Sequence, residues 1–355
     1  MKPKRVAIVA EWLTSRGGAE TVVQALLDIF PKADLFTTVF NEKMNSEFIR
    51  YNPRTSYLQR IPIINRRHQS ATFLLLNAIK SLDLSGYDLI ISSSSAIGKG
   101  IRKPKNAVHI CYCHTPMRYA WEPEVDDRVA KLPFGKSLIS YLKKWDLATN
   151  KGVDYFVANS KYTADRIKQY YNRNAIVIYP PVTIAPKQNF PKEDFYLVIS
   201  RLVKYKRFDL AVKACKELNR RLVIGGDGPE FEHLKEISGE KTEFIGRVGN
   251  SKKTEYFAKA RALIFPADED FGIVPIEAMA QGTPIIAYKK GGVMETVTDG
   301  KTGVFFNQQD VNSLKSAIMR SEKIRFDQNE LIKQAKKFSK EAFSKKIRNF
   351  IDKIS

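Results

Sequence analysis

The chain has 355 residues, of which 43% are hydrophobic and 27% are charged, and its formal net charge at pH 7 is +21. This length and apolar content suffice for two domains with their own cores, which excludes a disordered tail. The positive charge indicates an anionic partner, such as nucleic acid, anionic lipid or a phosphorylated substrate.

No apolar segment has the length of a targeting or membrane-spanning sequence. The segment Arg5–Ala10 is too short for the core of a signal peptide and is predicted to be a strand. The densest later segment, Phe73–Ile79, is far below the roughly 20 residues that cross a bilayer. We therefore expect a chain that does not cross a membrane. Cys111, Cys113 and Cys215 match no metal or disulfide pattern, so we expect reduced cysteines packed in the core of a cytoplasmic protein.

Strands and helices alternate along the first half of the chain, which predicts a parallel sheet built from β-α-β units. A helix is expected at residues 19–30, and strands are expected at residues 5–10, 35–39, 89–92, 107–113 and 155–158. Gly17 and Gly18 lie between the first strand and its helix, where glycine allows backbone to approach a phosphate or sugar closely. Because G-x-G-x-x-G is absent, a dinucleotide fingerprint is unsupported, and a simple tight turn is the alternative.

Basic and apolar residues are mixed in two segments of this half. Nine Lys and Arg residues lie between Arg54 and Lys105, against two acidic residues. Arg66 and Arg67 adjoin the apolar Ile63 and Ile64. The second segment, Lys131–Trp145, places apolar residues at helical spacing beside lysines. This combination is typical of contact with an anionic membrane surface, and a solvated helix face over a core stripe is the alternative.

His114 directly follows a predicted strand and begins the segment His-Thr-Pro-Met-Arg-Tyr-Ala-Trp. A side chain at the carboxyl end of a strand in a parallel sheet points toward the ligand-binding crevice. We therefore expect His114 to donate a hydrogen bond to a sugar hydroxyl, and a structural histidine is the alternative.

A break follows at residues 179–191, which contain four prolines and are predicted to link two domains. A second series of strands then begins, expected at residues 195–199, 221–224, 242–245, 262–265, 284–287 and 303–306, with a helix at 208–218. The tail, residues 310–355, has a helical pattern. The sequence therefore predicts an α/β protein with two Rossmann-like, doubly wound domains facing a cleft.

Arg201 and Lys206 follow the first strand of the second domain. Arginine by its fork and lysine as a point charge would clamp a diphosphate and stabilise the charge that develops on a departing nucleoside diphosphate. A solvated basic turn is the alternative. The glycine-rich stretch Gly225–Pro229 is interpreted as a turn that lines the cleft.

The most informative stretch contains Glu269 and Glu277, eight residues apart across the start of a predicted helix. Pro275 suits the first turn of this helix and Gly282 suits its end. The carboxylates would accept hydrogen bonds from hydroxyls, and a phosphate would meet the backbone N–H groups of Phe271, Gly272, Ile273 and Val274. The implied ligand is a sugar nucleotide, and ordinary dipole complementation is the alternative.

The acidic run Asp268-Glu-Asp270 contains D-x-D, a motif with which many other sugar transferases hold a divalent metal ion. The cationic pair Arg201 and Lys206 would make such a metal redundant. We therefore expect no metal site and no cofactor other than the nucleotide-sugar substrate.

Taken together, these motifs resemble the family-4 glycosyltransferases of the GT-B fold across nearly the whole chain. The resemblance is carried by the Gly-Gly-Ala-Glu loop, Cys113-His-Thr-Pro-Met-Arg-Tyr-Ala-Trp, Ala158-Asn-Ser, the Arg201 and Lys206 pair, Gly-Gly-Asp-Gly-Pro and the E-x7-E pair. The segment from Cys113 is most similar to bacterial mannosyltransferase-like members that build polysaccharide or O-antigen on a lipid carrier.

This resemblance implies roles for the candidate residues. Glu277 would hold the nucleotide ribose and Glu269 the donor sugar, while Arg201 and Lys206 would bind the diphosphate. His114 would contact the donor sugar, and Gly17 and Gly18 would allow the approach of donor and acceptor. The residues expected to act in catalysis are then His114, Arg201, Lys206 and Glu269.

The resemblance also implies a division into an acceptor-side domain at 1–182, a donor domain at 183–340 and a helix at 341–355 that crosses back to the first domain. The implied reaction is retaining, metal-independent transfer of a mannose- or glucose-type hexose from a GDP- or UDP-sugar. The acceptor would be lipid-linked or a glycan in cell-surface polysaccharide synthesis, and the enzyme would be peripheral on the inner face of the cell membrane. We expect no nucleic acid partner.

Two other functions remain open from the sequence. A sugar-nucleotide 2-epimerase shares the two-domain form but needs a general acid and base acting on the donor sugar. A nucleic-acid or polyanion-binding protein explains the charge of +21 but leaves the paired carboxylates unexplained.

Overall fold

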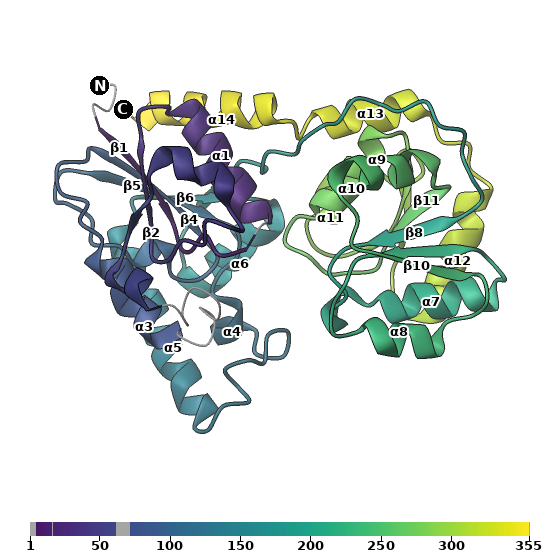
Figure 1. Ribbon diagram of the computed structural model, residues 1–355, viewed down its shortest axis with the longest axis horizontal. Coiled ribbons are helices and arrows are strands. Elements are labelled where there is room, and N and C mark those ends of the chain that lie inside the picture. The colour runs from purple at the N-terminus through teal and green to yellow at the C-terminus, as the bar shows by residue number, and fades with distance from the viewer. Residues whose placement is uncertain (1–4, 16, 62–71, 355) are drawn as a thin grey trace. The chain divides into compact units, whose positions relative to one another are not determined.

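The computed structural model describes residues 5–15, 17–61 and 72–354, and the chain divides into two compact α/β units (Figure 1). Unit 1 comprises residues 1–181 and 343–355, and unit 2 comprises residues 182–342. Arg66 and Arg67, with Ile63 and Ile64, belong to the predicted basic and apolar surface but lie outside the described residues.

Unit 1 contains a seven-stranded parallel sheet with the order β3-β2-β1-β4-β5-β6-β7. The central strand β1 is buried along its whole length, as expected for a parallel strand covered on both faces. The strands are β1 (Val6–Ala10), β2 (Asp34–Thr37), β3 (Arg54–Thr55), β4 (Leu89–Ser94), β5 (Val108–Cys113), β6 (Tyr155–Ala158) and β7 (Ala175–Val177).

Helices cover both faces of this sheet. The alternation of β1 sends Ile8 into the core beneath α1 and α14, and sends Val9 into the opposite core beneath α3 and α5. The α-helices are α1 (Gly18–Ile29), α3 (Thr72–Ala78), α4 (Arg118–Trp121), α5 (Gly135–Thr149), α6 (Lys161–Tyr171) and α14 (Lys340–Ile354). Short 3-10 helices are η1 (Ser46–Tyr51), η2 (Tyr57–Arg60), η4 (Ile79–Ser81), η5 (Gly98–Gly100) and η6 (Asn150–Gly152).

The helix α14 belongs to unit 1 although the chain reaches it only after unit 2. Phe343, Ile347, Phe350 and Ile351 recur at helical spacing and are all buried in the core that contains β1, β4 and β5. The Phe343 ring contacts the buried Tyr112 of β5, with 5.9 Å between ring centroids. This face of the sheet therefore depends on a segment distant in sequence.

Unit 2 contains a six-stranded parallel sheet with the order β10-β9-β8-β11-β12-β13. Its strands are β8 (Tyr196–Ile199), β9 (Leu222–Gly225), β10 (Thr242–Gly246), β11 (Ala262–Phe265), β12 (Ile285–Tyr288) and β13 (Gly303–Phe306). The predicted doubly wound α/β architecture is therefore present in both units.

The helices of unit 2 also lie on both faces of its sheet (Figure 1). They pack in two groups, with α7 against α8 and α12 on one side and α10 against α9 and α13 on the other. The elements are η7 (Lys204–Lys206), α7 (Phe208–Glu217), α8 (Phe231–Ile237), α9 (Asn250–Lys259), α10 (Ile273–Ala280), α11 (Val293–Thr296), α12 (Val311–Glu322) and α13 (Gln328–Lys336). Within the described residues, no helix is both long enough and apolar enough to span a bilayer.

Candidate functional site

The predicted donor-binding residues of unit 2 follow neighbouring strands of its sheet. Strands β9, β8, β11 and β12 are adjacent and parallel, so their carboxyl ends meet at one edge. Arg201 and Lys206 follow β8, Glu269 follows β11 and Gly291 follows β12. The topology therefore brings segments separated by up to 90 residues of sequence to one edge of the sheet.

Lys206 and Glu269 form an ion pair between the loops after β8 and β11. Lys206 is only 8% exposed, so its ammonium is removed from bulk water and held next to a carboxylate. Arg201 is exposed, and its side chain forms no hydrogen bond or ion pair among the described residues. The structure thus pairs one predicted phosphate-binding cation with a predicted sugar-binding carboxylate and leaves the other cation at the surface.

The loop after β12 packs closely against the loop that carries Glu269. The Gly292 N–H donates to the Glu269 carbonyl oxygen at 2.8 Å, and Lys290 pairs with Asp268 at 2.9 Å. Gly291 has φ +82°, and a Cβ there would lie 2.3 Å from the Glu269 carbonyl oxygen. Only glycine allows this approach, so Gly291 fixes the backbone position of Glu269.

Helix α10 begins and ends as its sequence predicts. Gly272 precedes it with φ +83°, Pro275 lies in its first turn, and Gly282 follows it with φ +73°. The predicted phosphate-binding residues Phe271, Gly272, Ile273 and Val274 form the end of the loop and the start of this helix. The first N–H groups of a helix have no intrahelical acceptor, and the helix dipole makes this end positive.

Glu277 lies one turn into α10 and is paired with a lysine that the sequence did not single out. The Nζ atom of Lys253, on α9, lies 2.8 Å from one carboxylate oxygen of Glu277 and 3.0 Å from the other. Burial raises the pKa of Glu277, and the positive charge of Lys253 partly offsets this rise. Lys253 was missed because it lies in a charged stretch, although it is four residues before the buried Phe257 and shares its helix face.

His114 lies at the corresponding carboxyl edge of the sheet in unit 1. One ring nitrogen, Nε2, lies 2.8 Å from Ser93 Oγ at the end of β4, and the ring lies 5.2 Å from that of Tyr112 between centroids. Its carbonyl oxygen accepts a hydrogen bond from the Asn159 side chain at 2.9 Å. Burial lowers the pKa of His114 to about 4, so the imidazole is neutral at pH 7.

Glu11, which the sequence did not identify as a site residue, organises the same edge. It is 6% exposed at the end of β1, and burial raises its pKa. One carboxylate oxygen, Oε1, accepts hydrogen bonds from the Ser94 hydroxyl at 2.9 Å and from the N–H groups of Ser95, Ala96 and Gly98 at 2.6 to 2.8 Å. Glu11 therefore holds the loop that follows β4, next to the strand position of Ser93.

Gly17 and Gly18 stand at the start of α1, after β1, as predicted. Gly17 is exposed and its backbone is extended, and a Cβ there would meet only Glu20 Oε2, at 3.4 Å. The packing of unit 1 therefore does not require glycine at position 17. Ligand approach, the reason predicted from the sequence, remains a prediction.

The segment after His114 is fastened by buried polar groups of α5 and α6. Arg166 donates to Thr115 at 3.0 Å and pairs with Glu122 at 2.6 Å. The Trp121 ring N–H donates to Asp146 at 2.7 Å. Asp146 is in turn paired at 2.7 Å with Lys99, and both side chains are almost fully buried. The backbone that follows His114 is thus held by side chains of α5 and α6.

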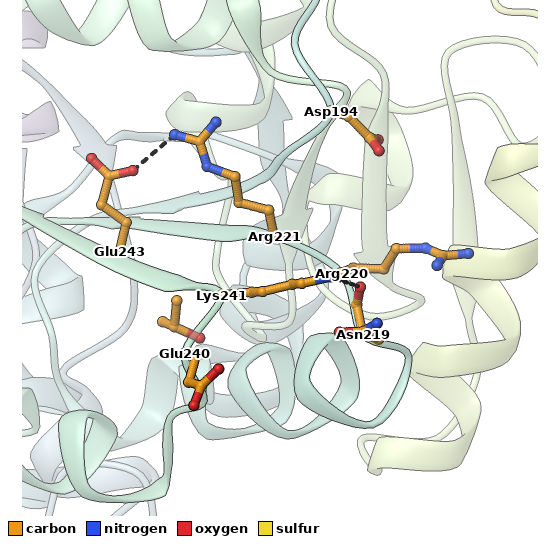
Figure 2. Close-up of a pocket in the computed structure, with 8 residues that line it drawn as sticks. Asp194, Asn219, Arg220, Arg221, Glu240, Lys241 and Glu243 are labelled. Atoms are coloured by element: carbon orange, nitrogen blue, oxygen red, sulfur yellow. Dashed lines mark hydrogen bonds and ion pairs between the residues drawn. The ribbon is translucent and has the colours of Figure 1, made fainter.

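A cavity of about 620 Å³ lies elsewhere in unit 2 (Figure 2). Asp194, Arg221 and Lys241, which line it, each precede a strand, so it lies at the amino ends of β8, β9 and β10. Arg221 is paired with Glu243, another lining residue, at 2.9 Å, and Figure 2 marks this pair. The cavity is therefore at the opposite sheet edge from the predicted donor residues.

Across the part of the chain that the structure describes, no group of three or more His, Cys, Asp or Glu side chains is placed to hold a metal ion. Asp268 instead pairs with Lys290, as described above. The expectation of metal-independent chemistry remains a prediction.

Models of known protein families match both halves of the chain. Residues 16–185 match the model for "Glycosyltransferase Family 4", and residues 182–338 match the model for "Glycosyl transferases group 1". An uncharacterized glycosyltransferase of Methanocaldococcus jannaschii is 28% identical over 57% of this chain and 60% of its own length. The alpha-1,3/1,6-mannosyltransferase ALG2 of Saccharomyces cerevisiae is 25% identical over 91% of this chain and 77% of its own.

Among solved structures, Anabaena HepE in complex with UDP-glucose has a TM-score of 0.70 and 16% sequence identity, and the match covers 98% of this chain and 99% of HepE. The fold of this chain therefore agrees with that of HepE over nearly its whole length. With both family models matched in succession along the sequence, the chain belongs to the family-4 glycosyltransferases of the GT-B fold and is a transferase enzyme.

Proposed function

We propose that the protein is a retaining glycosyltransferase that moves a mannose- or glucose-type hexose from a GDP- or UDP-sugar to a lipid-linked or glycan acceptor in cell-surface polysaccharide synthesis. The names of the yeast mannosyltransferase and of the UDP-glucose complex support a hexose and a nucleotide-sugar donor. The two names differ in the sugar, and the first names no nucleotide, so both donor families remain within the proposal.

The observation that carries the proposal is the ion pair between Lys206 and Glu269 at the carboxyl edge of the sheet in unit 2. A diphosphate needs a cation and a sugar needs hydrogen-bond acceptors, and this pair supplies both at one place. Arg201, exposed after the same strand, provides a second cation with the fork geometry that suits phosphate oxygens. The proposed transfer needs no metal, because these two cations would offset the charge of the departing diphosphate.

The bond changes of the proposed reaction are simple. The bond between the sugar C1 and the diphosphate oxygen breaks, and a bond between C1 and an acceptor hydroxyl oxygen forms on the same face. The hydroxyl proton passes to the leaving phosphate, so no protein base is needed, and because the acceptor oxygen itself attacks C1, no protein nucleophile is needed. Glu269 would hold the sugar hydroxyls, and a hydrogen bond from the neutral His114 to the donor sugar remains a prediction.

We further propose that unit 1 contacts an anionic membrane surface through α5 and the loop before it. Phe134 is 84% exposed in this loop, and Leu132 and Tyr141 are also exposed. Lys131 and Lys136 lie beside them in the sequence, so apolar side chains and positive charges occur together. That combination suits the headgroup region of an anionic bilayer and access to a lipid-linked acceptor.

The first test is a thermal-unfolding panel with UDP, GDP, ADP and their sugar conjugates, each measured with EDTA present. A ligand at 100 times its dissociation constant stabilises the folded state by about 2.7 kcal/mol. Selective stabilisation by one diphosphate family, with EDTA present, would identify the donor base and support metal-independent binding. Transfer is then measured with that donor and radiolabelled sugar.

Two results would contradict the proposal. Conversion of the nucleotide sugar to an isomer without an acceptor would instead indicate an epimerase. No response to any nucleotide, together with steeply salt-dependent binding of nucleic acid, would indicate a polyanion-binding protein.

A further inference from the structure

The lysine that pairs with Glu277 has no assigned role. Lys253 lies in the second turn of α9, and its ammonium meets both oxygens of the Glu277 carboxylate, at 2.8 and 3.0 Å. The two side chains are 24% and 19% exposed. Because two hydrogen bonds from one nitrogen reach both oxygens, rotation of the carboxylate about its last bond is restricted.

Lys253 is also the only ion-pair partner of Glu277 among the described residues. Its neighbour Lys252 points elsewhere and pairs with Glu255 at 3.0 Å. On α13, which also packs against α10, Lys333 pairs with Glu330 at 3.4 Å. Glu277 is therefore paired with one cation, while Lys252 and Lys333 have other partners.

The hydrogen-bonding capacity of a carboxylate shows what this arrangement leaves available. An ionised carboxylate has about four lone-pair positions, two on each oxygen. Lys253 uses one position on each oxygen. One position then remains on each oxygen, which matches the two neighbouring hydroxyls of a ribose. The lysine does not have to leave when a ribose binds.

We propose that Lys253 is a positioning residue for the nucleotide ribose, which fixes the Glu277 carboxylate so that each oxygen presents one free lone pair to the 2′- and 3′-hydroxyls. This inference rests on the proposed role of Glu277 in donor binding. It goes beyond that role because it makes recognition of the ribose a property of the lysine–carboxylate pair. It also predicts that the pair acts on binding of the nucleotide and not on the transfer step.

The test compares ribose-containing ligands with ligands that lack both hydroxyls. Dissociation constants are measured by calorimetry for UDP, GDP and their 2′,3′-dideoxy forms. The quantity of interest is the ratio of the dideoxy to the ribose dissociation constant. Two hydrogen bonds to a charged acceptor predict a ratio of about 10 or more in the unaltered protein. The variants are Lys253→Met, Lys253→Arg, Glu277→Gln and the matched control Lys252→Met.

We expect Lys253→Met and Glu277→Gln each to reduce this ratio toward 1, mainly by raising the dissociation constant of the ribose-containing ligand. Lys253→Arg keeps the charge and both hydrogen bonds and should restore the ratio. Lys252→Met removes an adjacent, exposed lysine and should leave it unchanged. In transfer assays, Lys253→Met should raise KM for the donor with little change in kcat.

The outcomes separate this inference from the proposed function. A Lys253→Met protein that keeps the full ratio, while Glu277→Gln loses it, overturns the role of Lys253 alone. If Glu277→Gln also keeps the ratio, Glu277 does not bind ribose, and both the inference and that part of the proposed function are wrong. A folded Lys253→Arg protein with the ratio lost as fully as in Lys253→Met would also contradict the role proposed here.

Discussion

Lys206 is a charged residue in a place where water is largely excluded. Its ammonium is paired with Glu269 and is only 8% exposed. A cation held in such a position acts on a developing negative charge more strongly than an exposed one does. We expect Lys206→Met to lower kcat for sugar transfer by about 100-fold or more. In other enzymes, removing one hydrogen-bond donor that stabilises the transition state has an effect of about this size.

The control for this variant is Lys204→Met, which removes an exposed lysine of the same short helix η7. Steady-state transfer with a fixed acceptor measures both variants, and thermal unfolding shows that each is folded. If Lys206→Met retained nearly full activity while folded, a role of Lys206 at the departing diphosphate would be ruled out.

Burial of two histidines predicts how stability changes with pH. The pKa values of His109 and His114 are both lowered to about 4 by burial, from about 6.5 in an unfolded chain. As the pH falls from about 6.5 toward 4, the unfolded chain takes up these protons and the folded protein does not. The two histidines should therefore lower the free energy of unfolding over this range, whereas Glu20, whose pKa burial raises to about 7, contributes in the opposite direction.

Urea unfolding at a series of pH values measures this decrease. Replacing His114 with Gln removes one of the two histidines, so the free energy of unfolding should fall less than in the unaltered protein as the pH is lowered from about 6.5 toward 4. The corresponding change at the exposed His233 provides the control. An identical slope in the unaltered protein and the His114→Gln variant would show that this histidine is accessible to protons in the folded state.

The sequence predicts which residues carry the chemistry better than it predicts their partners. The β-α-β pattern predicts Arg201, Lys206 and Glu269 directly after strands and Glu277 in the helix that follows one, and therefore all four near one sheet edge. The pairing of Lys253 with Glu277 was not predictable, since it joins two helices whose relative rotation is set by packing. Local spacing carries no direct information on such a contact.

At the scale of elements, the helix α14 offers a test of how much unit 1 depends on a distant segment. Phe343 is 1% exposed and contacts Tyr112 of β5. Replacing a buried phenylalanine with alanine typically costs about 3 to 5 kcal/mol. We expect Phe343→Ala to destabilise unit 1 by this amount and to leave unit 2 unchanged.

Hydrogen exchange locates this loss, because amides of β5 should exchange faster while those of β8 keep their protection. Lys345→Ala removes an exposed side chain of the same helix and serves as the control. Equal protection of β5 in the two variants would show that α14 contributes little to the stability of the sheet.

The two strands that the sequence missed share a physical reason. Strands β3 and β7 have two and three residues and form the two edges of their sheet. β3 is the polar pair Arg-Thr, and β7 is the apolar run Ala-Ile-Val but has only three residues, so neither has the length at which a pattern identifies a strand. Central strands such as β1 are recognisable because burial on both faces requires an unbroken apolar run.

At the scale of the whole molecule, the charge of +21 and the exposed apolar side chains of unit 1 predict binding to anionic vesicles. Binding should weaken as salt is added, because the electrostatic part is screened. Transfer of a phenylalanine side chain out of water is worth about 1.5 to 3 kcal/mol. We therefore expect Phe134→Ser to reduce vesicle affinity by about 10-fold or more.

Co-sedimentation with vesicles of phosphatidylcholine and phosphatidylserine measures this affinity. Met319→Ser, which removes an exposed apolar side chain from α12 of unit 2, is the matched control. If Phe134→Ser and Met319→Ser had equal affinity for vesicles, the contact surface would not include Phe134. If the unaltered protein bound equally well to vesicles with and without phosphatidylserine, electrostatic attraction would not contribute to binding.

The return of the chain from unit 2 to unit 1 has a consequence for the order of events at the ribosome. Residues 182–342 form a unit by themselves, whereas the core of unit 1 needs Phe343, Ile347, Phe350 and Ile351. At a synthesis rate of about 5 to 20 residues per second, translation of the intervening unit takes about 10 to 30 s. During that time the apolar surface that α14 will cover stays exposed on the nascent chain. The unit translated first is therefore the one whose folding is completed second, and its nascent form is the natural place for a chaperone to bind.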